Sequence, residues 1–442
     1  MDLSKLTCPK LFQLFQRALP DIWQRTRGTL RPAQVLYTIM TMTVSGTHGY
    51  RAVIDHLKRS VGGMLGWDDD TPAPFPSSFS DARRKLSPEK CYEAFQLIRK
   101  SCITKTLFPK VRYRDFRLVA CDSTTLALPA YENIREAFGA PKNRIGGDGA
   151  GPKANLTVLW DVTANAPLDW RLERCYASER YAVNSMLDAL ESTDLLIGDR
   201  GFPSYRMLTD LTRRGIAYLI RLPTGTRGAF SAAHDFAEDD AAWDTEVLIH
   251  ESHPARGEPT LPVRLIKRRL ENGSIAVFAT NLLSVTDHPA EGLADLYCYR
   301  WDIETAFREM KIWHGLENFR ARYANGIHQE VAALMIFMLL TAELEAKAKE
   351  HHHVLMTQRR ENGPEEPEIR FNRRQIGECV GYLLIAASKG PAAVTKEFIV
   401  CMESLWRFRQ KRKPGRTFPR QAKSANSKWK RTTYNTNKHG TR

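Results

Sequence analysis

The sequence predicts a mixed α/β protein whose sheet-forming region has helical regions before and after it in the chain. Short runs rich in β-branched residues occur between residues 116 and 222, and helical patterns alternate with the later runs. Apolar side chains at helical spacing characterise the first hundred or so residues and the region after residue 288. From residue 224 to about residue 283 helical periodicity disappears, and three more short strands are indicated.

Length and composition limit the class of protein. At 442 residues the chain is about three times the usual domain of ~150 residues, so two or more folded units are expected. A content of 43% hydrophobic and 26% charged residues excludes wholesale disorder, a collagen-like repeat and a disulfide-stapled miniprotein. No apolar run reaches the ~20 residues of a membrane span, no signal peptide is evident, and eight dispersed cysteines are typical of reduced thiols. We therefore expect a soluble cytoplasmic protein without a membrane partner.

Positive charge is concentrated at the C-terminus. The net charge is +15, yet residues 407–442 carry 13 basic and no acidic side chains, which leaves +2 on residues 1–406. No periodicity is present beyond Lys411, so residues 411–442 are predicted to be a basic disordered tail. Such a tail, with aromatic residues among its charges, fits nonspecific contact with DNA phosphates. The alternative is a disordered end that only keeps the protein soluble.

The N-terminal region is predicted to be helical. One helix begins at Arg31–Pro32, where apolar residues follow at helical spacing. Another begins near Ser87–Pro88, a capping residue followed by a proline in the first turn. A loop rich in proline and serine, Thr71–Ser80, separates the two helices. These patterns predict a helical domain that covers residues 1–112.

A series of strands and helices follows this domain. The predicted strands are Phe116–Cys121, Ala154–Val162, Leu168–Cys175, Leu195–Gly198 and Ile216–Leu222, with helices at Glu179–Ser192 and Ser204–Arg214. The later strands are Glu246–His250, Val263–Lys267 and Ile275–Thr280, which we interpret as a β insertion. After His288–Pro289 the pattern predicts a long helix to about His314, a second apolar helix over Ile327–Glu350, and more helix up to Trp406.

The most informative segment runs from Tyr297 to Lys311. On a helix that advances about 100° per residue, four side chains fall inside a wedge of about 60°, namely Tyr297, Arg300, Glu304 and Lys311. One face of this helix therefore presents a phenol, a guanidinium, a carboxylate and an ammonium group. The alternative is a solvated helix face with salt bridges between neighbouring turns.

Two aspartates follow predicted strands. Asp122 comes directly after Phe116–Cys121, and Asp199 comes directly after Leu195–Gly198. A carboxylate just past the C-terminal end of a strand lies at the sheet edge where α/β proteins place their sites, although a helix cap or a turn is the alternative for either residue. With Glu304, the two aspartates supply the hard oxygen ligands that Mg²⁺ or Mn²⁺ prefers. Cationic and phenolic side chains beside such ions suit a phosphodiester substrate.

Together these motifs closely resemble those of the DDE transposases of bacterial insertion sequences, specifically the insertion-sequence-four family. The spacing Tyr297-x2-Arg300-x3-Glu304-x6-Lys311 is similar to that family's Tyr-Arg-Glu-Lys signature. Asp122 in CDST and Asp199 in GDRGF resemble the settings of the family's first and second catalytic aspartates. The resemblance covers about residues 113–345.

The resemblance implies an RNase H-like (retroviral-integrase-like) catalytic core that a β-strand insertion interrupts between the second aspartate and the glutamate. A helical N-terminal domain precedes this core, and a helical C-terminal region follows it. The expected domains are the helical N-terminal domain at 1–112, the first part of the core at 113–223, the β insertion at 224–283, the second part of the core at 284–350, the C-terminal helical region at 351–410 and the basic tail at 411–442.

The resemblance also implies which side chains carry the chemistry. Asp122, Asp199 and Glu304 are the expected catalytic residues, and they would bind two Mg²⁺ ions, for which Mn²⁺ substitutes, about 4 Å apart. The expected contacts to DNA are Tyr297, Arg300 and Lys311, which would lie at the phosphates near the cleaved end, together with Arg200.

Two other parts of the chain are expected to contact DNA. In some relatives an aromatic residue of the β domain stacks on a flipped base, and Trp243, the only tryptophan of the insertion, is the candidate here. Core packing is the alternative for Trp243. The N-terminal domain would bind the terminal repeats, with Arg83, Arg84 and Lys85 as its phosphate contacts.

The activity that the resemblance implies is DNA transposition. Relatives cut at the ends of the element, expose 3′-hydroxyl groups and join them to target DNA. The expected partners are therefore double-stranded DNA, both terminal inverted repeats and target DNA, and a second copy of the chain in a homodimer. The expected location is the bacterial cytoplasm, at the nucleoid when the protein is bound to DNA. Two alternatives are a nuclease without strand transfer and a catalytically inactive DNA-binding derivative.

Overall fold

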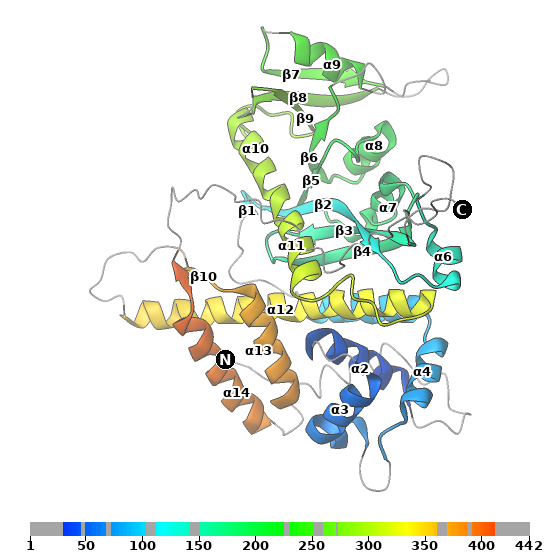
Figure 1. Ribbon diagram of the computed structural model, residues 1–442. Coiled ribbons are helices and arrows are strands. Elements are labelled where there is room, and N and C mark those ends of the chain that lie inside the picture. The colour runs from blue at the N-terminus through cyan, green and yellow to red at the C-terminus, as the bar shows by residue number, and fades with distance from the viewer. Residues whose placement is uncertain are drawn as a thin grey trace, which may run out of the picture.

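A mixed sheet and a long central helix organise the molecule (Figure 1). The structure is a computed structural model, and it describes residues 30–45, 49–67, 72–102, 112–141, 151–224, 230–239, 241–250, 260–270, 273–359, 369–386 and 391–411. The predicted basic tail therefore lies outside the described residues, apart from Lys411.

The N-terminal elements are helices, as the apolar spacing predicts. They are α2 (Pro32–Ser45), α3 (Tyr50–Leu65), α4 (Pro76–Lys85) and α5 (Pro88–Cys102). The predicted loop Thr71–Ser80 is wrong in its second half, because α4 begins at Pro76. Proline fits the first turn of a helix, where its missing N–H has no intrahelical acceptor, so this proline starts a helix rather than marking a loop.

The sheet runs in the order β4-β3-β2-β5-β6-β9-β8-β7, and β1 also pairs with β2. The strands are β1 (Arg112–Tyr113), β2 (Phe116–Ala127), β3 (Lys153–Asp161), β4 (Ala166–Arg174), β5 (Asp194–Gly198), β6 (Ala217–Leu222), β7 (Asp244–Ile249), β8 (Leu261–Arg269) and β9 (Ile275–Thr280). β2, β5 and β6 are parallel, whereas the other neighbouring pairs are antiparallel. All five residues of β5 are buried, as expected of a central parallel strand.

The strands predicted between residues 224 and 283 do not form a sheet of their own. β9 pairs with β6, and β8 and β7 extend the same sheet outward. The expected lack of helix in this stretch is also wrong, because α9 covers Ser231–Glu238. Phe236 and Ala233 of α9 are buried, and an eight-residue helix with so few apolar contacts leaves only a short periodic signal in the sequence.

Helices cover both faces of the sheet. On one face, α7 (Glu179–Asn184), α8 (Tyr205–Arg213) and α9 pack with a short 3₁₀ turn, η2 (Leu187–Ala189). On the other face lie α10 (Ala290–Leu296), α11 (Trp301–Ile312) and α12 (Ala324–Arg359), with α6 (Glu132–Phe138) near the end of α12. Alternate residues of β2 serve the two cores, since Leu118 and Ala120 belong to one and Val119 and Cys121 to the other.

Helix α12 lies between the sheet and the N-terminal helices (Figure 1). It contacts α2 and α5 along one side and β4 on another, and its residues 331–341 are all buried. An apolar run of this kind is buried on every side within a protein. The C-terminal helices α13 (Arg373–Ala386) and α14 (Pro391–Arg407) pack against α12, and β10 (Ile369–Arg370) pairs with β11 (Gln410–Lys411). No described helix combines the length and hydropathy needed to cross a bilayer.

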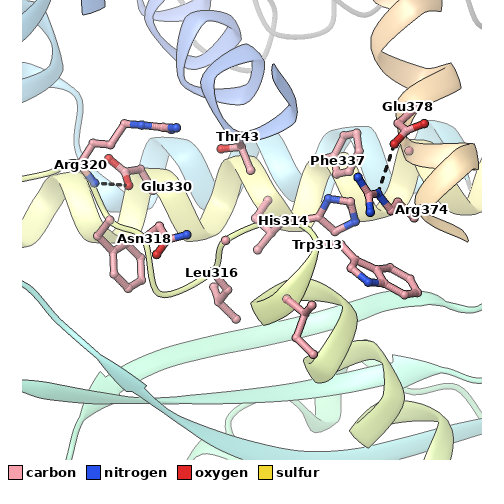
Figure 2. Close-up of a pocket in the computed structure, with 15 residues that line it drawn as sticks. Thr43, Trp313, His314, Leu316, Asn318, Arg320, Glu330, Phe337, Arg374 and Glu378 are labelled. Atoms are coloured by element: carbon pink, nitrogen blue, oxygen red, sulfur yellow. Dashed lines mark hydrogen bonds and ion pairs between the residues drawn. The ribbon is translucent and has the colours of Figure 1, made fainter. Parts of the chain in front are cut away.

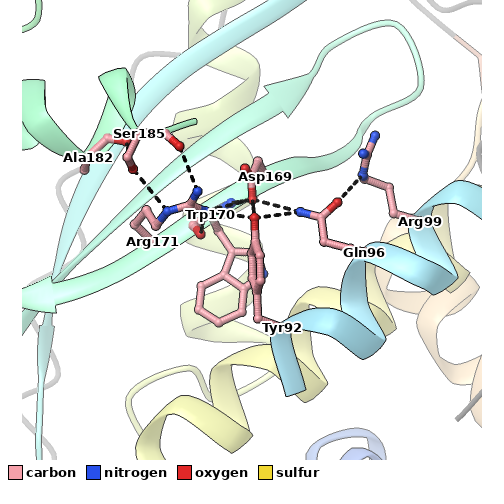
Figure 3. Close-up of polar contacts among 8 residues, drawn as sticks. All are labelled: Tyr92, Gln96, Arg99, Asp169, Trp170, Arg171, Ala182 and Ser185. Atoms are coloured by element: carbon pink, nitrogen blue, oxygen red, sulfur yellow. Dashed lines mark hydrogen bonds and ion pairs between the residues drawn. The ribbon is translucent and has the colours of Figure 1, made fainter. Parts of the chain in front are cut away.

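A buried carboxylate ties the N-terminal helices to the sheet (Figure 3). Asp169 of β4 is 3% exposed, and its Oδ1 accepts hydrogen bonds from Tyr92 and Gln96 of α5 and from Arg171. The aromatic ring of Tyr92 packs edge-on against Trp170. Because every partner of Asp169 is a donor, burial of this charge is compensated and the cluster fixes α5 on β4.

The interpretation of Arg83 as a DNA phosphate contact is wrong. Its side chain is fully buried, and its donors reach Gln329, Tyr50, the Gly326 carbonyl and Glu330 at 2.8 to 3.2 Å. Arg84 and Lys85, the next two residues, are exposed. The charge pattern alone does not distinguish these three positions, but α4 turns Arg83 toward α12.

Candidate active site

Two aspartates meet where the parallel strands β2 and β5 stop pairing. The last pair between the strands is Cys121 with Gly198, so Asp122 and Asp199 are the next residue on each strand. Neighbouring strands lie about 4.8 Å apart, which places the two backbones side by side. The prediction that Asp122 follows the end of a strand is wrong, because β2 continues to Ala127 with β3 as its partner. Asp122 instead lies just past the end of the parallel pairing with β5. Its side chain is therefore still at the sheet edge, beside Asp199.

Gly198 allows this close approach of β2 and β5. A Cβ atom added at Gly198 would lie 3.1 Å from the sulfur of Cys121, tighter than most real Cβ contacts. A larger residue there would push the two strands apart directly behind the aspartates. Close packing of β2 against β5 therefore explains the glycine before Asp199 in the GDRGF motif.

The long helix predicted from Pro289 to about His314 is instead three elements in succession, namely α10, a 3₁₀ turn and α11. The segment from Tyr297 to Lys311 is the turn followed by α11. The turn, η3, covers Tyr297–Arg300 and contacts both β2 and β5. Side chains three residues apart eclipse in a 3₁₀ turn, so Tyr297 and Arg300 point to the same side of the turn. η3 brings Tyr297 and Arg300 down onto the sheet edge, while α11 carries Glu304 above β2.

Ion pairs and hydrogen bonds join these residues to the two aspartates. Nη1 of Arg300 lies 2.6 Å from Oε1 of Glu304 and 3.6 Å from Oδ2 of Asp122. These two oxygens are therefore no more than about 6 Å apart, the sum of the two distances. The hydroxyl of Tyr297 donates to Oδ1 of Asp199 at 2.8 Å. Five of the predicted site residues thus form one connected cluster: Asp122, Asp199, Glu304, Tyr297 and Arg300.

The two aspartates differ in their electrostatic environment. Burial raises the pKa of Asp122 to about 6, although the Ser123 backbone N–H and Arg300 favour its charged form. Burial acts on Asp199 in the same direction, but the Arg200 backbone N–H, Tyr297, Arg300 and Arg221 outweigh it and hold its pKa below the ordinary value. Burial and the charge of Asp199 raise the pKa of Tyr297, so the phenol keeps its proton and remains a hydrogen-bond donor.

The carboxylates of the cluster are the kind of ligand that a divalent cation prefers, but they are not arranged around a metal position. Three carboxylates at one sheet edge are hard oxygen donors, and a cation, the guanidinium of Arg300, already bridges two of them. Within the described ranges, however, no three His, Cys, Asp or Glu side chains are arranged to hold a metal ion. The residues fit such an ion in their chemistry, and the guanidinium of Arg300 lies between two of them.

Lys311, the fourth signature residue, lies apart from the carboxylates. Its ammonium group donates to the Thr125 carbonyl at 2.8 Å and lies 3.4 Å from Glu317. Thr125 is three residues beyond Asp122 on β2, so Lys311 is on the same strand edge but farther along it. Arg200 is exposed beside Asp199, and its backbone N–H is the part that contacts that carboxylate.

Trp243 lies at the same edge of the sheet as the carboxylates but far along it. The register runs from Arg221, beside Asp199, through Phe278 and Ile266 to Asp244, the residue after Trp243. Five strand spacings separate β2 from β7, which corresponds to about 24 Å. Trp243 is 43% exposed, with Lys267 and Arg269 within 6 Å of its ring, so it does not pack in the core.

The sequence analysis missed two residues of this region. Arg221 of β6 is half-buried next to Asp199, and its charge favours the ionised form of that aspartate. The sequence signal that could have identified Arg221 is its position near the end of a buried strand of the same sheet. Trp301 is 52% exposed, and the guanidinium of Arg300 lies 5.3 Å from its ring. Nothing in its helical position distinguishes it from a surface residue.

A cavity of about 290 Å³ lies at the opposite end of α11 from the carboxylates (Figure 2). Trp313 and His314, which follow α11, contribute to its wall together with residues of α2, α12 and α13. Burial and Arg373 lower the pKa of His314 to about 4, so His314 is uncharged at neutral pH, and the charged residues of the wall are Arg320, Glu330, Arg374 and Glu378. None of the predicted site residues lines this cavity.

Comparison with known families identifies the region that carries the site. Residues 114–340 match the family model described as a transposase DDE domain, which is more than half of the chain. The chain belongs to this transposase family. The matched region begins just before β2 and ends within α12, so it includes every element that supplies the carboxylate cluster.

Other comparisons add less to the transposase assignment. A solved structure described as a piggyBac transposase synaptic complex with hairpin DNA is similar over 90% of this chain and 84% of that chain, with a TM-score of 0.45 and 10% identity. No match is found among curated proteins. The assignment as a DDE-type transposase therefore depends on the family match, and the mixed α/β sheet agrees with a transposase catalytic core.

Proposed function

We propose that this transposase binds the ends of an insertion sequence, cleaves the DNA by metal-dependent phosphodiester hydrolysis and joins the 3′-hydroxyl ends to target DNA. The observation that carries the proposal is the convergence of Asp122, Asp199 and Glu304, which come from two parallel strands and a later helix, with a guanidinium and a phenol among them. The finer assignment to the insertion-sequence-four family is part of the same proposal and is supported by the Tyr-Arg-Glu-Lys spacing.

The three carboxylates are the proposed ligands of two Mg²⁺ ions, for which Mn²⁺ substitutes. When bound, such ions activate the attacking oxygen and stabilise the charge on the leaving oxygen of a phosphodiester. The low pKa of Asp199 keeps one ligand ionised at neutral pH. Asp122 and Glu304 lie close enough for one cation to contact both, as Arg300 does.

Arg300 and Tyr297 are the proposed contacts to the scissile phosphate. The side chain of Arg300 is 10% exposed, and its Nε–H has no hydrogen-bond partner among the described residues. A buried donor without an acceptor is costly, and a phosphate oxygen would satisfy it with a charge-assisted bond. Tyr297 supplies a second donor on the same side of the cluster.

The sheet edge offers a path for DNA beyond the cleaved end. Arg200, Arg221 and Arg269 lie along it between the carboxylates and Trp243. We propose that the backbone of the element end follows these charges and that Trp243 stacks on an unpaired base, which its exposure permits. Lys311 would contact a phosphate farther along β2.

The remaining parts of the proposal concern assembly. The N-terminal helices with Arg84 and Lys85 would bind the terminal repeats, and the basic tail would contact DNA without sequence preference. We expect a homodimer on paired ends, working at the nucleoid in the bacterial cytoplasm. The domain boundaries given above stay predictions.

A cleavage assay on duplexes that carry the element's own ends tests the proposal. The unmutated protein should nick these ends with Mg²⁺ and should join pre-cut 3′-hydroxyl ends to a target plasmid. Cutting without joining would instead identify a nuclease. Binding to the ends without either reaction would identify a catalytically inactive derivative.

A further inference from the structure

The three carboxylates of the site are each held by a residue of the signature segment. Arg300 pairs with Glu304 and reaches Asp122, and Tyr297 donates to Asp199. The side chains that are proposed to bind phosphate therefore use the proposed metal ligands as their partners.

The position of Arg300 makes these contacts mutually exclusive with metal binding. A divalent ion that contacts both Asp122 and Glu304 must lie between them, and Nη1 of Arg300 is within 3.6 Å of an oxygen of each. The guanidinium is held in this position without an added acceptor, since its side chain is 10% exposed and it packs near the rings of Tyr297 and Trp301. Two cations in this small volume repel each other, and the buried setting screens that repulsion poorly.

Arg300 also has a donor, its Nε–H, that a phosphate oxygen can bind. Its Nε–H has no hydrogen-bond partner among the described residues, although it is buried. A carboxylate pair and a phosphate are alternative acceptors for one guanidinium, and a phosphate can take two of its donors at once. The arginine is incompletely satisfied by the carboxylates alone.

We propose that Arg300 is an internal counter-ion that occupies the metal position in the DNA-free protein, and that the scissile phosphate draws it away so that DNA and divalent ions bind cooperatively. This inference depends on the proposed function, because it takes the carboxylates as metal ligands. Coupling of this kind is reciprocal, so the ions raise the affinity for DNA by the same factor. Arg300 thereby prevents the carboxylates from binding the metal ions before a DNA end is bound.

Metal binding without DNA tests this inference apart from activity. Mn²⁺ binding to the full-length protein is measured by electron paramagnetic resonance for the unmutated chain and for Arg300→Gln. We expect Arg300→Gln to bind Mn²⁺ at least about tenfold more tightly, because the carboxylates lose their internal cation. Arg308→Gln, which removes an exposed arginine from the same helix, should leave the affinity within about twofold.

Two further variants make every outcome informative. Arg300→Lys keeps a cation without the planar fork, so its affinity should lie between those of the unmutated chain and Arg300→Gln, and it covers the case in which Arg300→Gln does not fold. Equal Mn²⁺ affinity in the unmutated chain and in a folded Arg300 variant would overturn the inference. Asp122→Asn should weaken Mn²⁺ binding in either background. If it does not, the ligand assignment in the proposed function fails, which is a distinct result.

Discussion

Arg83 and Arg300 are both buried arginines beside a glutamate, yet their surroundings differ in one respect. The donors of Arg83 reach a glutamine, a tyrosine, a backbone carbonyl and a carboxylate within the protein. Arg300 is held by two carboxylates, while its Nε–H has no described partner. A satisfied polar network fixes helices in place, whereas an incompletely satisfied one at a sheet edge is suited to exchange partners with a ligand. The comparison separates an arginine with a structural role from one that we propose binds the substrate phosphate.

The largest effect is expected at the carboxylate cluster. Asp122→Asn removes a proposed metal ligand and should lower DNA cleavage by about a thousandfold or more, while binding to the element ends persists. Gel-based nicking and mobility-shift assays measure the two quantities. Asp115→Asn, an exposed position in the turn before β2, is the matched control and should leave both unchanged. Near-normal nicking by Asp122→Asn would remove Asp122 from the catalytic set.

The structural arginine should show the opposite pattern. Arg83→Met leaves Glu330 and Gln329 without their buried partner, so we expect a loss of about 3–5 kcal/mol in the free energy of unfolding. Denaturant unfolding measures this loss. Lys85→Met, two residues along α4 and exposed, should change stability by less than about 0.5 kcal/mol. A small loss for Arg83→Met would show that the buried network contributes little and would weaken the comparison.

The pH dependence of stability should carry the signature of Asp122. Burial raises its pKa from 3.8 to about 6, so between these values the folded state binds more protons than the unfolded state. Stability is therefore lost as the pH rises through this interval, by at most about 3 kcal/mol. Asp122→Asn cannot titrate, so the difference in unfolding free energy between the variant and the unmutated chain should grow in the variant's favour from pH 4 to pH 6. Taking the difference cancels the contribution of Asp161, whose pKa burial also raises to about 6. A difference that stays constant with pH would contradict the raised pKa.

The sequence predicted which segments form strands, and it grouped residues that the structure brings together, better than it predicted local geometry. The spacing of Tyr297, Arg300 and Glu304 was sufficient to group them, because residues three and four apart remain neighbours in either kind of helix. The partner of Lys311 was not predictable, because helical spacing gives the direction of its side chain and not the Thr125 carbonyl that it contacts. The burial of Arg83 depends on α12, more than two hundred residues away, and no local pattern records that contact.

The smallest expected effects come from two tyrosines, one in each network. Tyr50→Phe removes the acceptor of a fully buried Arg83 N–H, so it should cost about 1–3 kcal/mol of stability and leave cleavage unchanged. Tyr297→Phe removes one donor to Asp199 at a partly open site, so it should cost about 1 kcal/mol or less while cleavage falls about tenfold. Thermal unfolding and the nicking assay are measured on both variants. If Tyr50→Phe lowered cleavage as much as Tyr297→Phe, the two networks would be coupled. The division between a structural and an exchangeable cluster would then fail, because a partner change at the sheet edge would depend on the packing of α4 against α12.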